Sequence, residues 1–152
     1  MKPRIGFEKI WFDEHIIELK IEVCDGESLF VNEVYVGNDQ LGELCHELLA
    51  LKNQIPLGKS DISLGDFGPK SASGGFHAHV RFQTPGNLLV STHQESEFGK
   101  FFSEEGAAEA KMFLRSEPIL LDQFISELES LDSGTSSSAV MHCVPRNDTE
   151  LD

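Results

Sequence analysis

The chain of 152 residues has few cysteines, few basic residues and no long apolar run. Its cysteines, Cys24, Cys45 and Cys143, are too few and too scattered to form a disulfide framework. No apolar stretch approaches the roughly 20 residues that a membrane-spanning helix requires. The first residues also lack the apolar segment of a secretory signal peptide. We therefore expect a reduced, cytoplasmic protein with no membrane contact.

The scarcity of basic residues restricts the partners of the chain. It has 12 Lys and Arg residues against 26 Asp and Glu residues, which gives a formal net charge of −14. Such a surface repels nucleic acid, whose binding depends on Lys and Arg residues that neutralise phosphates, and it repels anionic membranes. It attracts a basic protein and accelerates that encounter by electrostatic steering. High solubility is the simpler interpretation of the same charge.

Sequence motifs of common enzyme classes are also missing. The chain contains no G-x-S-x-G, H-E-x-x-H or C-x-x-C motif and no phosphate-binding glycine loop, for which the pair Gly74-Gly75 is too weak a signal. Cys45 falls on the apolar stripe of an expected helix, so we interpret it as a small core residue rather than a nucleophile. We therefore expect no catalytic residue and no cofactor.

Periodic apolar residues define the expected secondary structure. Alternation of apolar and polar residues predicts strands with one buried face, whereas apolar residues spaced three and four apart predict amphipathic helices. The sequence Ser116-Glu117-Pro118 is typical of a helix start, with the serine hydroxyl as the cap. By these criteria we expect strands over residues 5–12, 17–23, 29–36, 61–67, 76–83, 88–94 and 108–115, and helices over residues 41–52 and 118–131.

These elements predict an α+β fold. Strands that follow one another in sequence favour hairpins, so we expect a mostly antiparallel sheet of six or seven strands with two amphipathic helices packed on one face. Residues 1–131 should form a single domain. The Ser-rich segment that begins at Asp132 is linker-like, and we therefore expect residues 132–152 to form a flexible or disordered tail.

Three histidines are the candidate metal ligands. His77 and His79 lie on the polar face of one expected strand. With a three-residue loop before the partner strand, His79 falls opposite His93, and three imidazoles on one face suit zinc. A register error of one residue would move His93 to the other face. The alternatives are therefore a metal-binding protein or metal-dependent enzyme, and an ordinary solvated sheet face.

An acidic stretch with interspersed phenylalanines is the candidate docking surface. Aromatic side chains bordered by carboxylates are suited to a basic protein partner, because aromatic residues anchor interfaces and charges steer the encounter. The alternative is an ordinary loop whose phenylalanines cover the core. The residues of the candidate surface are Glu95, Glu97, Phe98, Phe101, Phe102, Glu104 and Glu105.

The order of the elements resembles that of small bacterial α+β proteins of unknown function, found among the immunity proteins of polymorphic-toxin and contact-dependent growth inhibition systems. The likeness covers roughly residues 15 to 131 and rests on architecture and acidity. It implies a non-enzymatic protein that holds a cognate toxin domain inactive by blocking its active site or a nearby surface. The matching features are the strands at 17–23 and 29–36, the helix at 41–51, the hairpin at 76–94, and a final helix with Leu121, Phe124 and Leu128 on one face.

A third interpretation of the same sequence is a homodimeric adaptor. If both helices cover one face of the sheet, the other face is left exposed and is available for a second copy of the chain.

Overall fold

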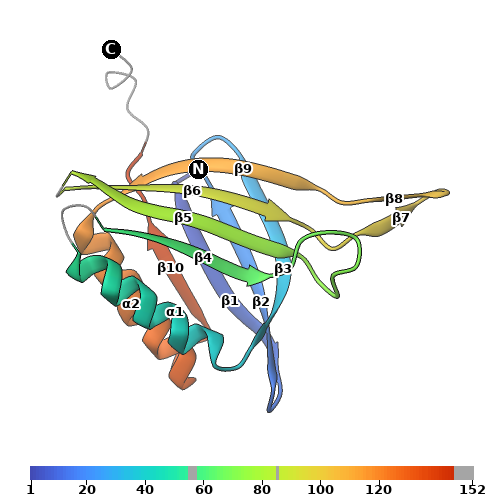
Figure 1. Ribbon diagram of the computed structural model, residues 1–152, viewed down its shortest axis with the longest axis horizontal. Helices are drawn as coiled ribbons and strands as arrows, with labels where there is room; N and C mark the ends of the chain where they lie inside the picture. The colour runs from blue at the N-terminus through green and yellow to red at the C-terminus, as the bar shows by residue number, and fades with distance from the viewer. Residues whose placement is uncertain (55–57, 85, 146–152) are drawn as a thin grey trace.

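The strands form two four-stranded antiparallel sheets and one two-stranded ribbon (Figure 1). The structure, a computed structural model, describes residues 1–54, 58–84 and 86–145. In chain order the elements are β1 (Arg4–Phe12), β2 (Ile16–Cys24), β3 (Leu29–Gly37), α1 (Gln40–Asn53), β4 (Lys59–Gly65), β5 (Gly75–Thr84), β6 (Asn87–Glu95), β7 (Gly99–Phe101), β8 (Glu104–Gly106), β9 (Glu109–Ser116), α2 (Pro118–Ser133) and β10 (Ser138–His142).

The α+β class, the mostly antiparallel pairing and the two helices are confirmed, but the single sheet of six or seven strands is wrong. In the part of the chain that the structure describes, ten strands are divided among the order β10-β1-β2-β3, the order β4-β5-β6-β9 and the ribbon β7-β8. The division was hidden from the sequence, because strand periodicity shows which face of a strand is buried but not which strands pair.

The two larger sheets pack their apolar faces toward one core. In β2 the alternating residues Leu19, Ile21 and Val23 are fully buried, as their period of two predicts. The ring of Phe7 in the first sheet meets the ring of Phe76 in the second, with centroids 5.8 Å apart in an edge-on arrangement. The inner faces of both sheets therefore contribute to one continuous hydrophobic core.

The two helices lie side by side and close this core (Figure 1). Helix α1 contacts β4, and α2 contacts β10. The ring of Phe124 on α2 lies 5.7 Å from the ring of Phe7. Helix α2 starts with Pro118, as the sequence predicted, and ends at Gly134, whose φ of 83° gives a left-handed cap. None of the described helices is long and apolar enough to cross a membrane.

Ser116 does not cap α2. Its hydroxyl is fully buried in β9 and donates to the carbonyl oxygen of His142 at 2.8 Å. Glu117 takes the cap position without a side-chain hydrogen bond. The serine is therefore used to join the second sheet to the end of the first, a tertiary role that its local sequence does not indicate.

The prediction that the tail begins at residue 132 is wrong for most of that segment. Helix α2 continues to Ser133, and β10 pairs with β1 from Ser138 to His142. Ala139 and Met141 are buried in the core. The backbone N–H of Val140 donates to the Glu127 carboxylate at 3.2 Å, which covers part of this edge strand. The strand is short and follows a Ser-rich turn, so its alternation was a weak signal; residues 146–152 lie outside the described residues.

Two closely packed glycines lie where the two large sheets meet, one at the end of β4 and one just before β5. Gly65 has a φ of +67°, and a Cβ there would overlap the Gly74 carbonyl and the Val34 side chain. A Cβ on Gly74 would lie 2.6 Å from the carbonyl oxygen of Glu95. The Asn32 side chain donates to that same oxygen at 3.0 Å. These glycines therefore allow the backbones of the two sheets to come into close contact. We call this contact the junction, and it supports the end of β6.

Candidate functional site

The ribbon β7–β8 and its turn, residues 99–106, form an arm that projects from the body of the protein (Figure 1). Gly99 pairs with Gly106 and Phe101 with Glu104. At its base the backbone N–H of Ser96 donates to the carbonyl oxygen of Ala108 at 2.8 Å. The arm therefore extends the β6–β9 strand pair beyond the edge of the core, and the second sheet holds its base.

Two phenylalanines form the tip of the arm. The side chain of Phe101 is 69% exposed and that of Phe102 is 91% exposed. Their rings touch each other in an edge-on arrangement with centroids 4.8 Å apart. Phe102 also has a φ of 56°, a left-handed conformation that bulky residues rarely adopt. An exposed aromatic pair on a strained turn is typical of a contact surface rather than of a folding requirement.

Three exposed carboxylates lie on the arm and at its base. Glu104 and Glu105 belong to the arm and are exposed, and Glu97 is exposed at its base. Lys100 lies opposite Glu105 in the ribbon. The arm thus carries aromatic groups within a mainly acidic rim, which is the combination that the sequence predicted for this segment.

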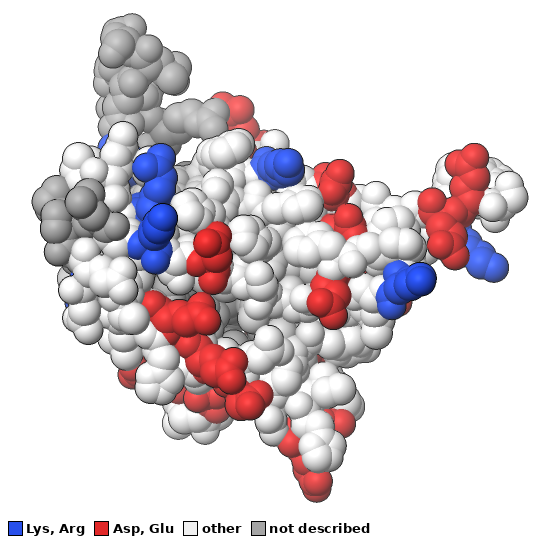
Figure 2. All heavy atoms as spheres, in the orientation of Figure 1, with Lys and Arg blue, Asp and Glu red and all other residues white. Residues whose placement is uncertain are grey.

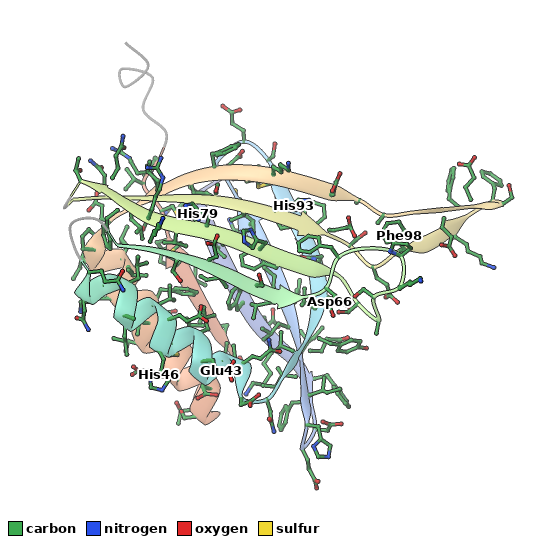
Figure 3. The ribbon with its side chains drawn as sticks, in the orientation of Figure 1. Glu43, His46, Asp66, His79, His93 and Phe98 are labelled. Atoms are coloured by element: carbon green, nitrogen blue, oxygen red, sulfur yellow. The ribbon has the colours of Figure 1, made fainter. Side chains whose placement is uncertain are left out.

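The other two predicted contact residues lie closer to the body. Phe98 is half-buried at the base of the arm (Figure 3). The carboxylate of Glu95 accepts the backbone N–H of Gly68 at 2.7 Å and holds the loop between β4 and β5. The structure therefore gives Glu95 an internal partner, and the exposed part of the candidate site is narrower than the predicted segment.

The three candidate histidines share one face. Their face is the outer face of the second sheet, over which Figure 3 labels His79 and His93. His77, not His79, pairs with His93. The expected register was wrong by two residues, because Thr84 pairs with Asn87 and a bulge follows in β5. A register shift of two residues leaves each side chain on the same face of the sheet. The prediction that the three histidines share one face is therefore confirmed.

Each histidine lies next to a carboxylate. His79 Nδ1 is 2.9 Å from Asp61 Oδ1, and His77 Nε2 is 3.4 Å from the same oxygen. The hydrogen bond from His79 is the main reason that the pKa of Asp61 is lowered from 3.8. His77 and His79 therefore share the Asp61 carboxylate, whereas His93 lies next to Glu109.

His93 has its own surroundings. Its Nε2 lies 2.9 Å from the Glu109 carboxylate, and its ring stacks on Phe67 with centroids 4.7 Å apart. Among the residues that the structure describes, no group of three or more His, Cys, Asp or Glu residues is arranged to hold a metal ion. The geometry therefore does not favour the histidine metal site that the sequence offered as an alternative.

The cysteines are core residues in the structure. Cys24, Cys45 and Cys143 are all free and buried. Burial raises the pKa of the Cys45 thiol to about 11 and that of Cys143 to about 12. Both thiols are thus protonated at neutral pH, and a protonated thiol is a poor nucleophile. The interpretation of Cys45 as a small core residue is confirmed.

The outer face of the second sheet also carries a charge gradient that the sequence analysis missed. The strand registers place side chains in rows across β4, β5, β6 and β9. Figure 2 shows a group of Lys and Arg side chains at the end of this face farthest from the arm, and carboxylates together with a basic side chain on the arm itself. The row farthest from the arm is Lys59, Arg81, Leu89 and Arg115, and the row nearest to it is Gly65, Gly75, Glu95 and Glu109.

No known protein family, curated protein or solved structure matches this chain. The candidate site therefore rests on its own geometry.

Proposed function

We propose that this chain is a non-enzymatic protein-binding module whose arm docks into a basic partner. We further propose that the partner is a toxin domain, and that the chain acts in the cytoplasm as the immunity protein that neutralises it. The observation that carries the proposal is the exposed aromatic tip formed by Phe101 and Phe102.

The aromatic tip supplies the binding energy in this proposal. Complete burial of a phenylalanine side chain contributes about 1.5–3 kcal/mol relative to its exposure to water. Phe101 and Phe102 retain most of their surface for such a gain, and they project together from a ribbon that the sheet holds at its base. A small number of buried aromatic anchors often dominates the affinity of a protein interface.

The carboxylates supply the preference for a basic partner. Glu104 and Glu105 lie beside the aromatic tip and Glu97 lies at the base of the arm, and the formal net charge of −14 attracts positive surfaces over a longer range. A toxin domain with a basic substrate groove would be blocked sterically by the arm and electrostatically by these carboxylates. The inhibitor would then occupy the groove in the way that a nucleic-acid backbone could, without any chemistry of its own.

The proposal is tested with a matched pair of baits. The first is the double variant Phe101→Ser/Phe102→Ser, which removes both anchors. The second is Ile119→Ser, which removes a 59% exposed apolar side chain from α2, away from the arm. Wild type and both variants are used for affinity capture from the native organism in low and high salt. The captured protein is then purified, and its toxicity and inhibition are measured.

A stoichiometric basic protein should bind wild type and Ile119→Ser, dissociate more readily at high salt, and be lost from the arm variant. Its toxic activity should be inhibited by wild type and not by the arm variant. A partner that binds all three baits equally would exclude the arm as the docking site. A partner without toxic activity would leave a binding module but reject the immunity function.

A further inference from the structure

A groove with basic edges lies at the end of the second sheet that is farthest from the arm. It has a volume of about 410 Å³, and Leu89 and Phe113 line it with apolar surface. Arg81, Arg115 and His79 border the same groove. Phe113 is 69% exposed, and Arg81 makes no ion pair with any residue that the structure describes. On a chain with few cations, this is a concentrated site for an anionic, apolar group.

Other residues of the groove reduce its positive charge only in part. Asp25 lies on its border and places one negative charge beside the two positive charges of Arg81 and Arg115, while its carboxylate also accepts the backbone N–H groups of Glu27 and Ser28 at 2.9 and 2.8 Å. His79 is held by Asp61, and Arg115 reaches the Asn87 side chain at 3.4 Å. Arg81 thus remains the cation with the most freedom to meet a ligand.

The arm of the same molecule is too distant to fill its own groove. Both features belong to the β6–β9 strand pair, but they lie at opposite ends (Figure 1). Strand β6 has nine residues, so its ends are roughly 27 Å apart at 3.4 Å per residue. The arm also continues away from the groove rather than back across the sheet. Any contact between an arm and a groove is therefore a contact between two molecules.

We propose that two copies of this chain form a reciprocal dimer in which the arm of each lies in the groove of the other. Phe101 and Phe102 would contact Leu89 and Phe113, and Glu104 and Glu105 would face Arg81 and Arg115. The two contacts are related by a two-fold axis, the commonest symmetry of soluble dimers.

The charge gradient supports this antiparallel arrangement. When two copies meet in opposite directions with each arm in the groove of the other, the acidic end of one copy, which carries Glu104 and Glu105, faces the basic row of its partner that contains Lys59 and Arg81. The parallel arrangement would place like charges together, which disfavours it. The chain thus carries on one sheet both halves of a complementary pair of surfaces, an acidic aromatic arm and a basic apolar groove.

This inference rests on the proposed function of the arm as a docking element and adds a regulatory role to it. The dimer would cover the aromatic tips until a partner is present, because the partner and the second copy need the same arm. Partner binding would then be coupled to dissociation of the dimer, and the concentration of the partner would set the balance between them.

The test is analytical ultracentrifugation of the full chain as a function of concentration. The groove variant is Arg81→Glu and the arm variant is Phe101→Ser/Phe102→Ser; all three side chains are exposed, so both variants should fold. The control is Lys20→Glu, which makes the same charge change on β2 of the first sheet, away from the outer face of the second sheet. A fourth sample mixes the groove and arm variants in equal amounts.

Wild type should form a dimer whose dissociation constant rises at least tenfold in either variant and changes less than about twofold in the control. The mixture should dimerise more strongly than either variant alone, because the mixed dimer keeps one intact arm and one intact groove. A wild type that stays monomeric up to about 1 mM would overturn the proposal, since even contacts of transient size form there. The proposal would also be overturned by assembly beyond the dimer, or by a dimer whose dissociation constant is the same in wild type and in both variants.

The outcomes separate this inference from the proposed function. Arg81→Glu leaves the arm intact, so it should lose the dimer but still bind the basic partner. If wild type stays monomeric but still captures the partner, only the reciprocal contact is rejected. A dimer that behaves as expected in a chain that captures no partner would reject only the binding function proposed above.

Discussion

The two ends of the β6–β9 strand pair differ in charge, shape and packing. At one end the strands continue into an arm with an exposed aromatic tip and carboxylates. At the other end Arg81 and Arg115, from two strands, border a groove that Leu89 and Phe113 line with apolar surface. The formal net charge of −14 is therefore an average over a surface with two different ends. A protein of this composition still has a local site suited to anions.

The ends also differ in how the fold supports them. Gly65 and Gly74 pack the junction between the sheets beside the end of β6, where a side chain has no space. Gly99 and Gly106 lie in the arm itself, where a Cβ would meet no atom within 4 Å. A substitution at a glycine of the junction should therefore lower the free energy of unfolding much more than a substitution at a glycine of the arm.

The largest expected effect comes from Gly65→Ala at the junction. The added Cβ would overlap the Gly74 carbonyl and the Val34 side chain, and the φ of +67° disfavours alanine. Overpacking and backbone strain together should lower the free energy of unfolding by about 2–5 kcal/mol. Urea denaturation measures this loss. Gly106→Ala is the matched control, and a similar loss in both variants would contradict the difference between junction and arm.

The second-largest effect is expected on the affinity for the basic partner, which should fall in an arm variant but not in a groove variant. Loss of both tip anchors in Phe101→Ser/Phe102→Ser should lower the affinity for the basic partner by roughly 100-fold or more, which corresponds to about 3 kcal/mol. Arg81→Glu should change this affinity little, because Arg81 lies in the groove. Calorimetric titration of the purified partner measures both. An equal loss in the two variants would show that the ends do not act independently.

A smaller effect is expected from relief of backbone strain at the tip. Phe102→Gly places a residue without a Cβ at a φ of 56° and should stabilise the turn by about 1 kcal/mol. Hydrogen exchange of the arm amides should then slow. Phe101→Gly is the control, because Phe101 is a strand residue and glycine weakens a strand. Faster exchange in Phe102→Gly than in wild type would contradict strain at this position.

The smallest effect concerns the middle of the same outer face. The pKa of Asp61 is lowered mainly by its hydrogen bond from His79, and less by His77. Titration of the carboxyl carbon by NMR should place this pKa below 3.8 in wild type. His79→Gln should raise it toward the ordinary value, and His77→Gln should raise it less. The reverse order would mean that His77 is the main partner.

The same shift has a defined sign for stability. A carboxyl group with a lowered pKa in the folded state stabilises the protein above its unfolded pKa of about 3.9. That contribution decreases as the pH falls through the lower folded value. Because Asp61 is exposed, solvent screening keeps the contribution small. Acid unfolding of His79→Gln should therefore differ only slightly from that of wild type.

The amino-acid sequence by itself determined which face of each strand is buried. The alternation in β2 placed Leu19 and Ile21 in the core, and the alternation in β5 placed His77 and His79 outside. The composition of residues 95–105 also identified the acidic aromatic segment, part of which forms the arm. These features depend on the side-chain period of one strand and on local composition, so neighbouring residues were sufficient to predict them.

Only the tertiary structure decided how the strands pair and what they bring together. It divided them into separate sheets, moved the β5–β6 register by two residues, and completed the first sheet with β10. It also placed Arg81 beside Leu89 and Leu89 beside Arg115, which formed the basic end. Pairing joins residues that are distant along the chain, and its energy depends on the packing of whole faces rather than on local preference. The acidic aromatic composition of the arm was therefore visible in the sequence, whereas its β7–β8 ribbon and the groove existed only after the strands had paired.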